Sequence, residues 1–207
     1  HNVNALAGFE IEHTKTRYFG GEAANYQTAF TPELSAASVI RSLTGSGTDD
    51  ALISFLGKAE YNFNEKYFAA VSYRRDGSSR FSRQSRWGDF YSVSAAWRLT
   101  KEDFMNDLKW LSDAKLRASY GINGTLPNGL YEYVGNYVFG LDYDGYSGAS
   151  IMNVENLNLS WEKSRNLNLG LDLSFLRGRI STSIEYFNRY SHDLLLDREL
   201  SRVSGYT

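Results

Sequence analysis

The 207-residue chain contains no cysteine and only two prolines and two methionines. The absence of cysteine excludes disulfide frameworks, thiolate metal sites and thiol nucleophiles together, but it leaves the cellular compartment open. No run of about 18 apolar residues occurs, so no transmembrane helix is predicted. This absence does not bear on transmembrane strands, whose signal per segment is far weaker. The 22 basic residues are balanced by 24 acidic ones without a basic stripe, so no nucleic-acid partner is expected.

Aromatic residues make up 15% of the chain, and 18 glycines accompany them. This composition is typical of a strand-rich protein of one domain rather than of a disordered chain. The sequence begins at His1 without a signal peptide and already within an alternating pattern. We therefore expect a segment of a longer protein.

The chain is organised around residues 67–99, where apolar and polar side chains alternate twice. A period of two is typical of a sheet with one apolar face and one wet face. Between the two runs, residues 75–90 combine the turn chemistry of 76–79 with several charged residues, so they are predicted to form a wide polar loop. The unit is a tall antiparallel hairpin with a large cap.

The same period predicts seven strands in the whole chain. They cover residues 3–12, 53–63, 67–74, 91–99, 115–120, 166–175 and 180–187. Two long connections are predicted, at 13–50 with a short helix over 32–43 and at 122–162 with a local strand pair at 131–139. Two short turns are predicted at 64–66 and 177–178. The connection at 100–113 is predicted to contain one or two helical turns.

Two regularities bear on the choice between a membrane barrel and a soluble β-sandwich. The first is that the apolar positions of these strands carry no charge, as a lipid-facing surface requires. The core face of a sandwich has the same pattern, so this regularity alone does not separate the two folds. Long and short connections also tend to alternate, and the strands approach the roughly 9 to 11 residues that cross a tilted bilayer. Aromatic residues gather at both strand ends, as in the girdles of outer-membrane barrels: Phe63, Tyr67, Trp97 and Phe175 at the short-turn end, and Phe9, Tyr73, Tyr91, Tyr120 and Tyr186 at the other. The predicted fold is therefore an all-β antiparallel transmembrane β-barrel segment with long extracellular loops and short periplasmic turns.

Specific motifs then add a family resemblance. The runs RRDGSSRF (74–81), WG (87–88) and SVSAAWR (92–98) are followed by LSD (111–113), KLRASYG (115–121), NLNLSWEK (156–163), NLGLD (168–172) and DLLL (193–196). In this order they resemble the SusC/RagA family of TonB-dependent outer-membrane transporters. The one departure noted is Leu157, where the family often has proline.

The resemblance implies a 22-stranded barrel with a plug, which imports glycans or peptides with a SusD-like surface lipoprotein and TonB. Residues 1–207 would then be part of the barrel of such a receptor, in the outer membrane of a Gram-negative, Bacteroidota-like bacterium. The plug, the TonB box and the remaining strands would lie outside them. The first and last strands would leave unpaired edges in isolation, so we expect stability only within the parent assembly.

No catalytic, cofactor-binding or metal-binding residue is predicted, and the chain is not expected to be an enzyme. Carboxylate pairs such as Glu60 with Glu65 or Asp142 with Asp144 have no spacing that indicates glycosidase chemistry. His1, His13 and His192 lack metal-ligand spacing. Residues 76–79 and 121–124 are interpreted as turns rather than phosphate loops. Six loop aromatics either stack on a sugar or peptide or pack the loops together: Trp87, Tyr131, Tyr133, Tyr137, Tyr143 and Tyr146.

Two alternatives to transport remain at this point. The first is a soluble β-sandwich that acts as a carbohydrate-binding or adhesion module, in which a second sheet covers the apolar face. The second is a cell-surface hydrolase, which would lose turnover when one specific carboxylate is replaced. The substrate and the substrate-contacting residues stay unassigned.

Overall fold

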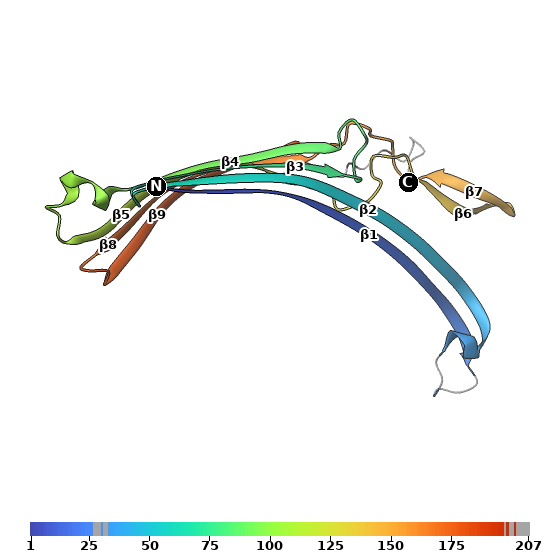
Figure 1. Ribbon diagram of the computed structural model, residues 1–207. Coiled ribbons are helices and arrows are strands. Elements are labelled where there is room, and N and C mark those ends of the chain that lie inside the picture. The colour runs from blue at the N-terminus through green and yellow to red at the C-terminus, as the bar shows by residue number, and fades with distance from the viewer. Residues whose placement is uncertain (27–29, 31–32, 197, 199–200, 202–207) are drawn as a thin grey trace. The chain divides into compact units, whose positions relative to one another are not determined.

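The computed structural model describes residues 1–26, 30, 33–196, 198 and 201. It contains a seven-stranded sheet in the order β1-β2-β3-β4-β5-β8-β9 and a separate two-stranded sheet, β6-β7 (Figure 1). The bounds are β1 Asn2–Tyr26, β2 Ala37–Phe63, β3 Tyr67–Ser78, β4 Trp87–Arg98, β5 Leu111–Thr125, β6 Tyr137–Tyr143, β7 Tyr146–Ile151, β8 Glu162–Phe175 and β9 Ile180–His192. The seven predicted strands are confirmed, and they form a meander into which β6 and β7 are inserted.

The registers keep the predicted phases together across the sheet. Val71 pairs with Ala59 on β2 and with Val93 on β4, whereas Ser72 pairs with Lys58 and Ser92. The pairing continues from β4 to β5, β8 and β9 in antiparallel register. Because neighbours in register lie on the same side of a sheet, the apolar residues form one face and the polar residues the other.

The chain divides into two compact units, residues 1–11 with 52–207 and residues 12–51. The second unit consists of the far parts of β1 and β2 and a 3-10 turn, Leu34–Ala36. The prediction of a long loop at 13–50 was therefore wrong, because most of the described residues of this stretch belong to β1 and β2. Polar side chains occupy both phases of this stretch, as in 13–17, so it lacks the alternation by which a strand is recognised.

The predicted helix over 32–43 was also wrong. Of the described residues in this range, only the 3-10 turn Leu34–Ala36 is helical, and β2 begins at Ala37. Pro32, on which the helix start was predicted, lies outside the described residues. Within this unit the hairpin is held by polar contacts between its strands, such as Nε2 of His13 at 2.6 Å from Oδ1 of Asp49.

The tight turn at 64–66 is confirmed. Asn64 and Glu65 have positive φ values of 49° and 55°, which gives the backbone twist that a close hairpin needs. The N–H of Lys66 donates to the carbonyl of Phe63 at 2.9 Å, and Asn62 Oδ1 accepts the N–H of Glu65 at 2.9 Å. The other short connection is wider than predicted, because β8 and β9 last pair at Phe175 and Ile180, which leaves residues 176–179 in the turn.

The connection from β4 to β5 contains two 3-10 turns, η2 (Leu99–Lys101) and η3 (Asp103–Met105). The predicted helical character of 100–113 is thus limited to single turns, since β5 already begins at Leu111, which pairs with Phe175 of β8. Among the described residues, no helix is long and apolar enough to cross a bilayer.

Several strands are longer than predicted, which corrects three turn assignments. Residues 76–78 belong to β3 and residues 121–124 to β5, so neither segment is a turn. The loop between β3 and β4 covers 79–86 rather than 75–90. The local strand pair predicted at 131–139 is instead β6 with β7, joined by Asp144 and Gly145, both at positive φ.

Candidate functional site

Among the described residues, no second layer covers the apolar face of the sheet. Val71 is 53% exposed, Val93 51% and Leu169 43%, although all three are mid-strand residues with ladder partners on both sides. The buried apolar residues among those described are few: Phe81, Phe90, Ala114 and Trp161. A soluble sandwich would have buried the apolar face, so this arrangement contradicts the sandwich alternative.

On the apolar face, the first charged side chains lie at the long-loop end of β3 and β4, just beyond a pair of tyrosines. Tyr73 and Tyr91 form a cross-strand pair, and the next pair towards the long loops on this face is Arg75 with Asp89. These two charges lie 3.7 Å apart, and the Tyr73 hydroxyl donates to Asp89 at 2.5 Å. The predicted strand positions on this face carry no charge, and Arg75 and Asp89, which were assigned to the loop, lie in the longer ends of β3 and β4 beyond those tyrosines.

The turn-side aromatic residues form a ladder on the same face. The rings of Phe63 and Tyr67 are 6.1 Å apart, and those of Tyr67 and Trp97 are 6.3 Å apart, both in stacked arrangements. Amphipathic rings of this kind suit a boundary between apolar and aqueous surroundings. The predicted cluster of aromatic residues at the short-turn end is therefore present.

The polar face carries a network centred on Arg117. Its Nε lies 3.1 Å from Oδ2 of Asp172, and its Nη2 contacts Glu185 on β9. Asp172 is held in turn by the Ser183 hydroxyl, which donates to Oδ1 at 2.6 Å. Gly170 lies beneath the guanidinium, where an added Cβ would be 2.7 Å from Nε and Cζ of Arg117. A glycine at this position lets one arginine bridge three strands.

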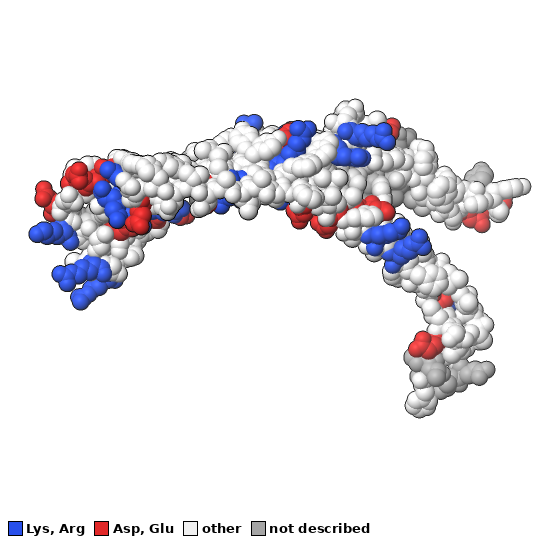
Figure 2. All heavy atoms as spheres, in the orientation of Figure 1, with Lys and Arg blue, Asp and Glu red and all other residues white. Residues whose placement is uncertain are grey.

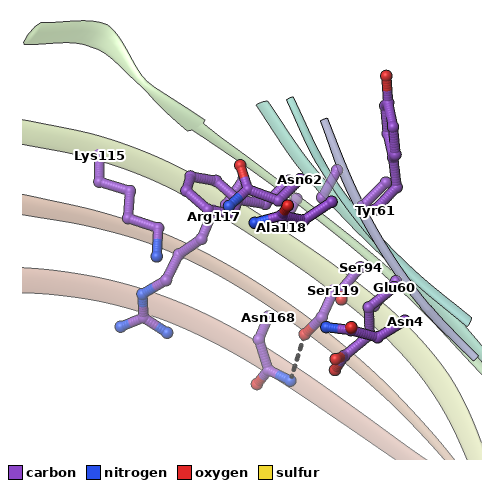
Figure 3. A pocket seen from close by; sticks show the side chains of 16 residues that line it. Asn4, Glu60, Tyr61, Asn62, Ser94, Lys115, Arg117, Ala118, Ser119 and Asn168 are labelled. Atoms are coloured by element: carbon purple, nitrogen blue, oxygen red, sulfur yellow. Dashed lines mark hydrogen bonds between the residues drawn. The ribbon is translucent and has the colours of Figure 1, made fainter. Parts of the chain in front are cut away.

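A hollow of about 500 Å³ opens beside this network on the polar face (Figure 3). Its floor consists of small residues, since Ala70 pairs with Ser94, and Ser94 with Ser119. Figure 3 shows Glu60, Lys115, Arg117 and Asn168 on one side of the sheet, whereas Tyr61 points to the other. The polar side chains around the hollow are Asn2, Asn4, Glu60, Asn62, Lys115, Arg117, Ser119 and Asn168.

The chemistry of the hollow is that of a hydrogen-bonding surface. The Asn168 amide donates to the Ser119 hydroxyl at 3.3 Å, and the Lys115 ammonium lies 5.1 Å from the centre of the Phe68 ring. Amides and hydroxyls both donate and accept, so they suit sugar hydroxyls and peptide groups alike. No group of three or more metal-ligating side chains occurs within the described part of the chain.

A second arrangement anchors the long loops above the polar face. The rings of Phe81, Phe90 and Trp161 form a buried cluster, with both phenylalanine centroids 5.2 Å from that of Trp161. The indole N–H of Trp161 donates to the carbonyl of Arg86 at 3.0 Å. An added Cβ at Gly124 would overlap the Phe90 ring. This loop-anchoring cluster joins the 79–86 loop to the segment before β8.

Polar contacts strengthen this anchoring. Three side chains of the 79–86 loop donate to a single acceptor, the carbonyl of Leu157: Ser82 at 2.6 Å, Gln84 at 3.3 Å and Ser85 at 3.3 Å. Arg80 donates to the carbonyl of Pro127 at 2.8 Å. The loop is thereby tied to two distant stretches of the chain.

A third cluster lies at the turn end, around Glu102. Its carboxylate accepts the Trp97 indole N–H at 2.9 Å and the Tyr67 hydroxyl at 2.7 Å, and it lies 2.5 Å from the Lys66 ammonium. The hydrogen bond from Lys66, followed by that from Tyr67, holds the pKa of Glu102 below its ordinary value. The same carboxylate raises the pKa of Lys66. This turn-side clasp joins the 64–66 turn to the 99–110 connection.

The structure separates the candidate residues that the sequence suggested. Glu60 is paired with Lys58 and Glu65 with Lys101, so each carboxylate has its own cation. Asp142, near the end of β6, accepts the N–H of Gly145, and Asp144 lies in the β6-β7 turn itself, so both carboxylates belong to the hairpin. The three histidines have different partners in the fold, namely Tyr61 for His1, Asp49 for His13 and Asp193 for His192.

The remaining candidates have structural positions. Asp76 lies in β3, where its Oδ1 accepts Nε of Arg74 at 2.7 Å. Trp87 stacks on Phe55 of the apolar face with the Arg75 guanidinium over its ring. Tyr137 and Tyr146 are 58% and 76% exposed on the β6-β7 hairpin. The Tyr143 side chain lies outside the described parts.

A single-layer sheet with an exposed apolar face and a hydrogen-bonding polar face defines the wall of a membrane barrel. The chain matches the family profile described as "TonB dependent receptor-like, beta-barrel" over residues 1–206. The chain therefore belongs to the TonB-dependent receptor-like β-barrel family. It is also similar to individual SusC- and RagA-type proteins, in agreement with the resemblance found in its motifs.

Two relatives and one solved structure illustrate this similarity. The chain is 35% identical to "TonB-dependent receptor SusC" of Bacteroides thetaiotaomicron, with 94% of the chain and 20% of that protein covered. It is 31% identical to "TonB-dependent receptor P39" of Formosa agariphila, with 100% and 20% covered. A structure of the RagAB peptide transporter matches with a TM-score of 0.88 at 27% identity, covering 98% of the chain and 23% of the solved one. The chain thus spans about a fifth of the length of these relatives.

Proposed function

We propose that residues 1–207 form part of the barrel wall of a SusC-like outer-membrane transporter that imports glycans or peptides in a TonB-dependent manner. The observation that carries this proposal is the exposure of the apolar face, where no layer of described residues covers the mid-strand valines and leucines. Exposing apolar area to water costs roughly 25 cal/mol per Å², so an exposed apolar face favours a hydrocarbon surrounding. The site of action is the outer membrane of a Gram-negative bacterium.

The polar face is then the lumenal wall. Its hollow, lined by amides and hydroxyls, offers hydrogen bonds along the path of a solute. The loop-anchoring cluster holds the long connections at the other end of β3, β4 and β8, where a SusD-like surface lipoprotein would meet the transporter. The plug, the TonB-contacting segment and the other strands would belong to the rest of the protein. In this proposal the chain transports its substrate and does not transform it.

The lipid-facing assignment is tested on the full-length protein with single spin labels. This stretch contains no cysteine, so Val71→Cys and Ser72→Cys each place one label in it, on neighbouring residues of opposite faces. In membranes, we expect the label at 71 to collide with oxygen and the label at 72 with a water-soluble nickel complex. A label at 71 that is shielded from both reagents would indicate a covered protein core and overturn the proposal.

The transport function is tested in cells that carry the intact gene. We expect uptake of labelled oligosaccharides or peptides to stop when either this gene or TonB is deleted. Co-purification of a lipoprotein encoded beside the gene would identify the SusD-like partner. Uptake that is unchanged in both deletions would contradict the transport proposal, whatever the spin labels report.

A further inference from the structure

The turn between β8 and β9 presents two arginines without an acidic partner. Arg177 and Arg179 are exposed, and no acidic residue occurs between Asp172 and Glu185. Lys109 is exposed in the neighbouring 99–110 connection. Within the described part of the chain, these three side chains form no ion pair or hydrogen bond. Figure 2 shows basic side chains gathered at the tip of this hairpin.

The backbone holds this turn in a fixed conformation. Leu176, Arg177 and Gly178 have successive positive φ values of 52°, 59° and 82°. The N–H of Leu176 donates to the carbonyl of Trp110 at 3.0 Å, and that of Arg177 donates to the Ser112 hydroxyl at 2.7 Å. Non-glycine residues persist at positive φ when their surroundings impose it. The arginine-bearing turn is therefore fastened to the 99–110 connection.

Exposed apolar groups adjoin these cations. The rings of Trp110 and Phe175 are stacked 5.7 Å apart with only 7° between their planes. Trp110 and Leu176 are each 55% exposed, and Ile180 is 54% exposed. A tryptophan with aliphatic neighbours beside unpaired arginines is typical of the boundary between acyl chains and headgroups.

We propose that this patch, composed of Lys109, Trp110, Leu176, Arg177 and Arg179, binds the headgroup of an acidic glycerophospholipid in the turn-side leaflet. The proposal rests on the proposed function, because it requires the apolar face to be embedded in a bilayer. Arginine forks pair with phosphate oxygens, while Trp110 and Leu176 lie against the upper acyl chains. Asp103 and Asp107 lower the net charge around Lys109, so the two arginines make the larger contribution.

The test uses the full-length protein in nanodiscs and in detergent. Native mass spectrometry would count bound phosphatidylglycerol relative to phosphatidylcholine for the wild type and for the triple variant Lys109→Gln, Arg177→Gln and Arg179→Gln. The matched control removes three other exposed cations that form no ion pair or hydrogen bond with the described residues, as Lys15→Gln, Arg17→Gln and Arg83→Gln. Each surface charge changes anionic-lipid affinity by about fivefold, so the triple variant should bind on the order of a hundredfold more weakly.

The outcomes separate this proposal from the proposed function. Loss of phosphatidylglycerol in the triple variant, with retention in the control, would support the lipid site. Equal loss in the triple variant and the control, or equal retention in both, would overturn it. In that case the barrel assignment would still hold if the spin label at residue 71 reports lipid, because that measurement does not depend on these three cations.

Discussion

The loop-anchoring cluster and the middle of the sheet obey opposite packing rules. Around Trp161, which is 4% exposed, aromatic rings and backbone carbonyls are covered as in a soluble domain. In the middle of β3 and β4, Val71 and Val93 remain about half exposed. The loops must be folded by the protein's own interior, whereas the strands leave one face for an external apolar solvent. The difference indicates where the chain supplies a core and where the membrane does.

Replacing Trp161 should have the largest effect, because it removes the centre of the only substantial buried aromatic cluster among the described residues. Truncation of a buried tryptophan costs about 3 to 5 kcal/mol of stability. In Trp161→Ala of the full-length protein, we expect protease cleavage within 79–86 and 126–161 while the strands stay protected. Trp87→Ala is the control, since Trp87 is 41% exposed, and it should leave the loops resistant. Equal sensitivity of the two variants would contradict the anchoring role.

A charge on the apolar face should have the next largest effect. Val71→Arg places a guanidinium in the lipid, at a cost of about 2 to 4 kcal/mol near mid-membrane. Ser72→Arg adds the same charge one residue later on the polar face and should cost far less. Urea unfolding of the full-length protein in lipid vesicles measures both. If the two variants were equally stable, the division into a lipid face and a lumenal face would be wrong.

The sequence predicted the sheet better than the loops, and the reason is physical. The run Leu167 to Phe175 alternates without interruption because one side meets an apolar surrounding and the other a polar one. In residues 13–50 polar side chains occupy both phases, as in 13–17, so the alternation is missing and the strands were mistaken for a loop. A signal for β6-β7 was available, since Asp144-Gly145 is a typical pair for a two-residue hairpin turn. The ring partners of Trp161, Phe81 and Phe90, are 70 or more residues away in sequence, so spacing could not reveal them.

The candidate surfaces were recoverable only in part. The parity of Arg117, Asp172 and Glu185 placed all three on the polar face, but their network depends on the register between β5, β8 and β9. The role of Gly170 beneath Arg117 likewise requires coordinates. The Glu102 clasp joins residues from two connections, one of which was expected to be helical.

A glycine substitution tests the Arg117 network and should have a smaller effect. In Gly170→Ala the new methyl group would displace the guanidinium from Asp172 and Glu185. Because the displaced atoms belong to the flexible end of a partly exposed side chain, we expect only a small loss of stability. Gly57→Ala is the matched control, because its added Cβ would have no neighbour nearer than 4.0 Å. The melting temperature of the full-length protein in detergent should fall only for Gly170→Ala, and a similar fall for both variants would exclude this specific role.

The turn-side clasp should give the smallest effect and one that depends on pH. Because the pKa of Glu102 is lowered in the folded state, its stabilising contribution is complete above the unfolded pKa of about 4.3 and disappears as pH falls through the folded value. Acidification should therefore release the 64–66 turn and residues 99–105, which hydrogen exchange by mass spectrometry would detect as faster exchange after correction for the intrinsic pH dependence. The glutamine of Glu102→Gln cannot ionise. In this variant, hydrogen exchange in 64–66 and 99–105 should therefore be faster than in the wild type at neutral pH and should not change further with acid. Glu65→Gln, which alters a pair with 66% and 49% exposed side chains, should behave like the wild type, because such exposed pairs contribute little. An acid response that persists in Glu102→Gln would assign the titration to another group.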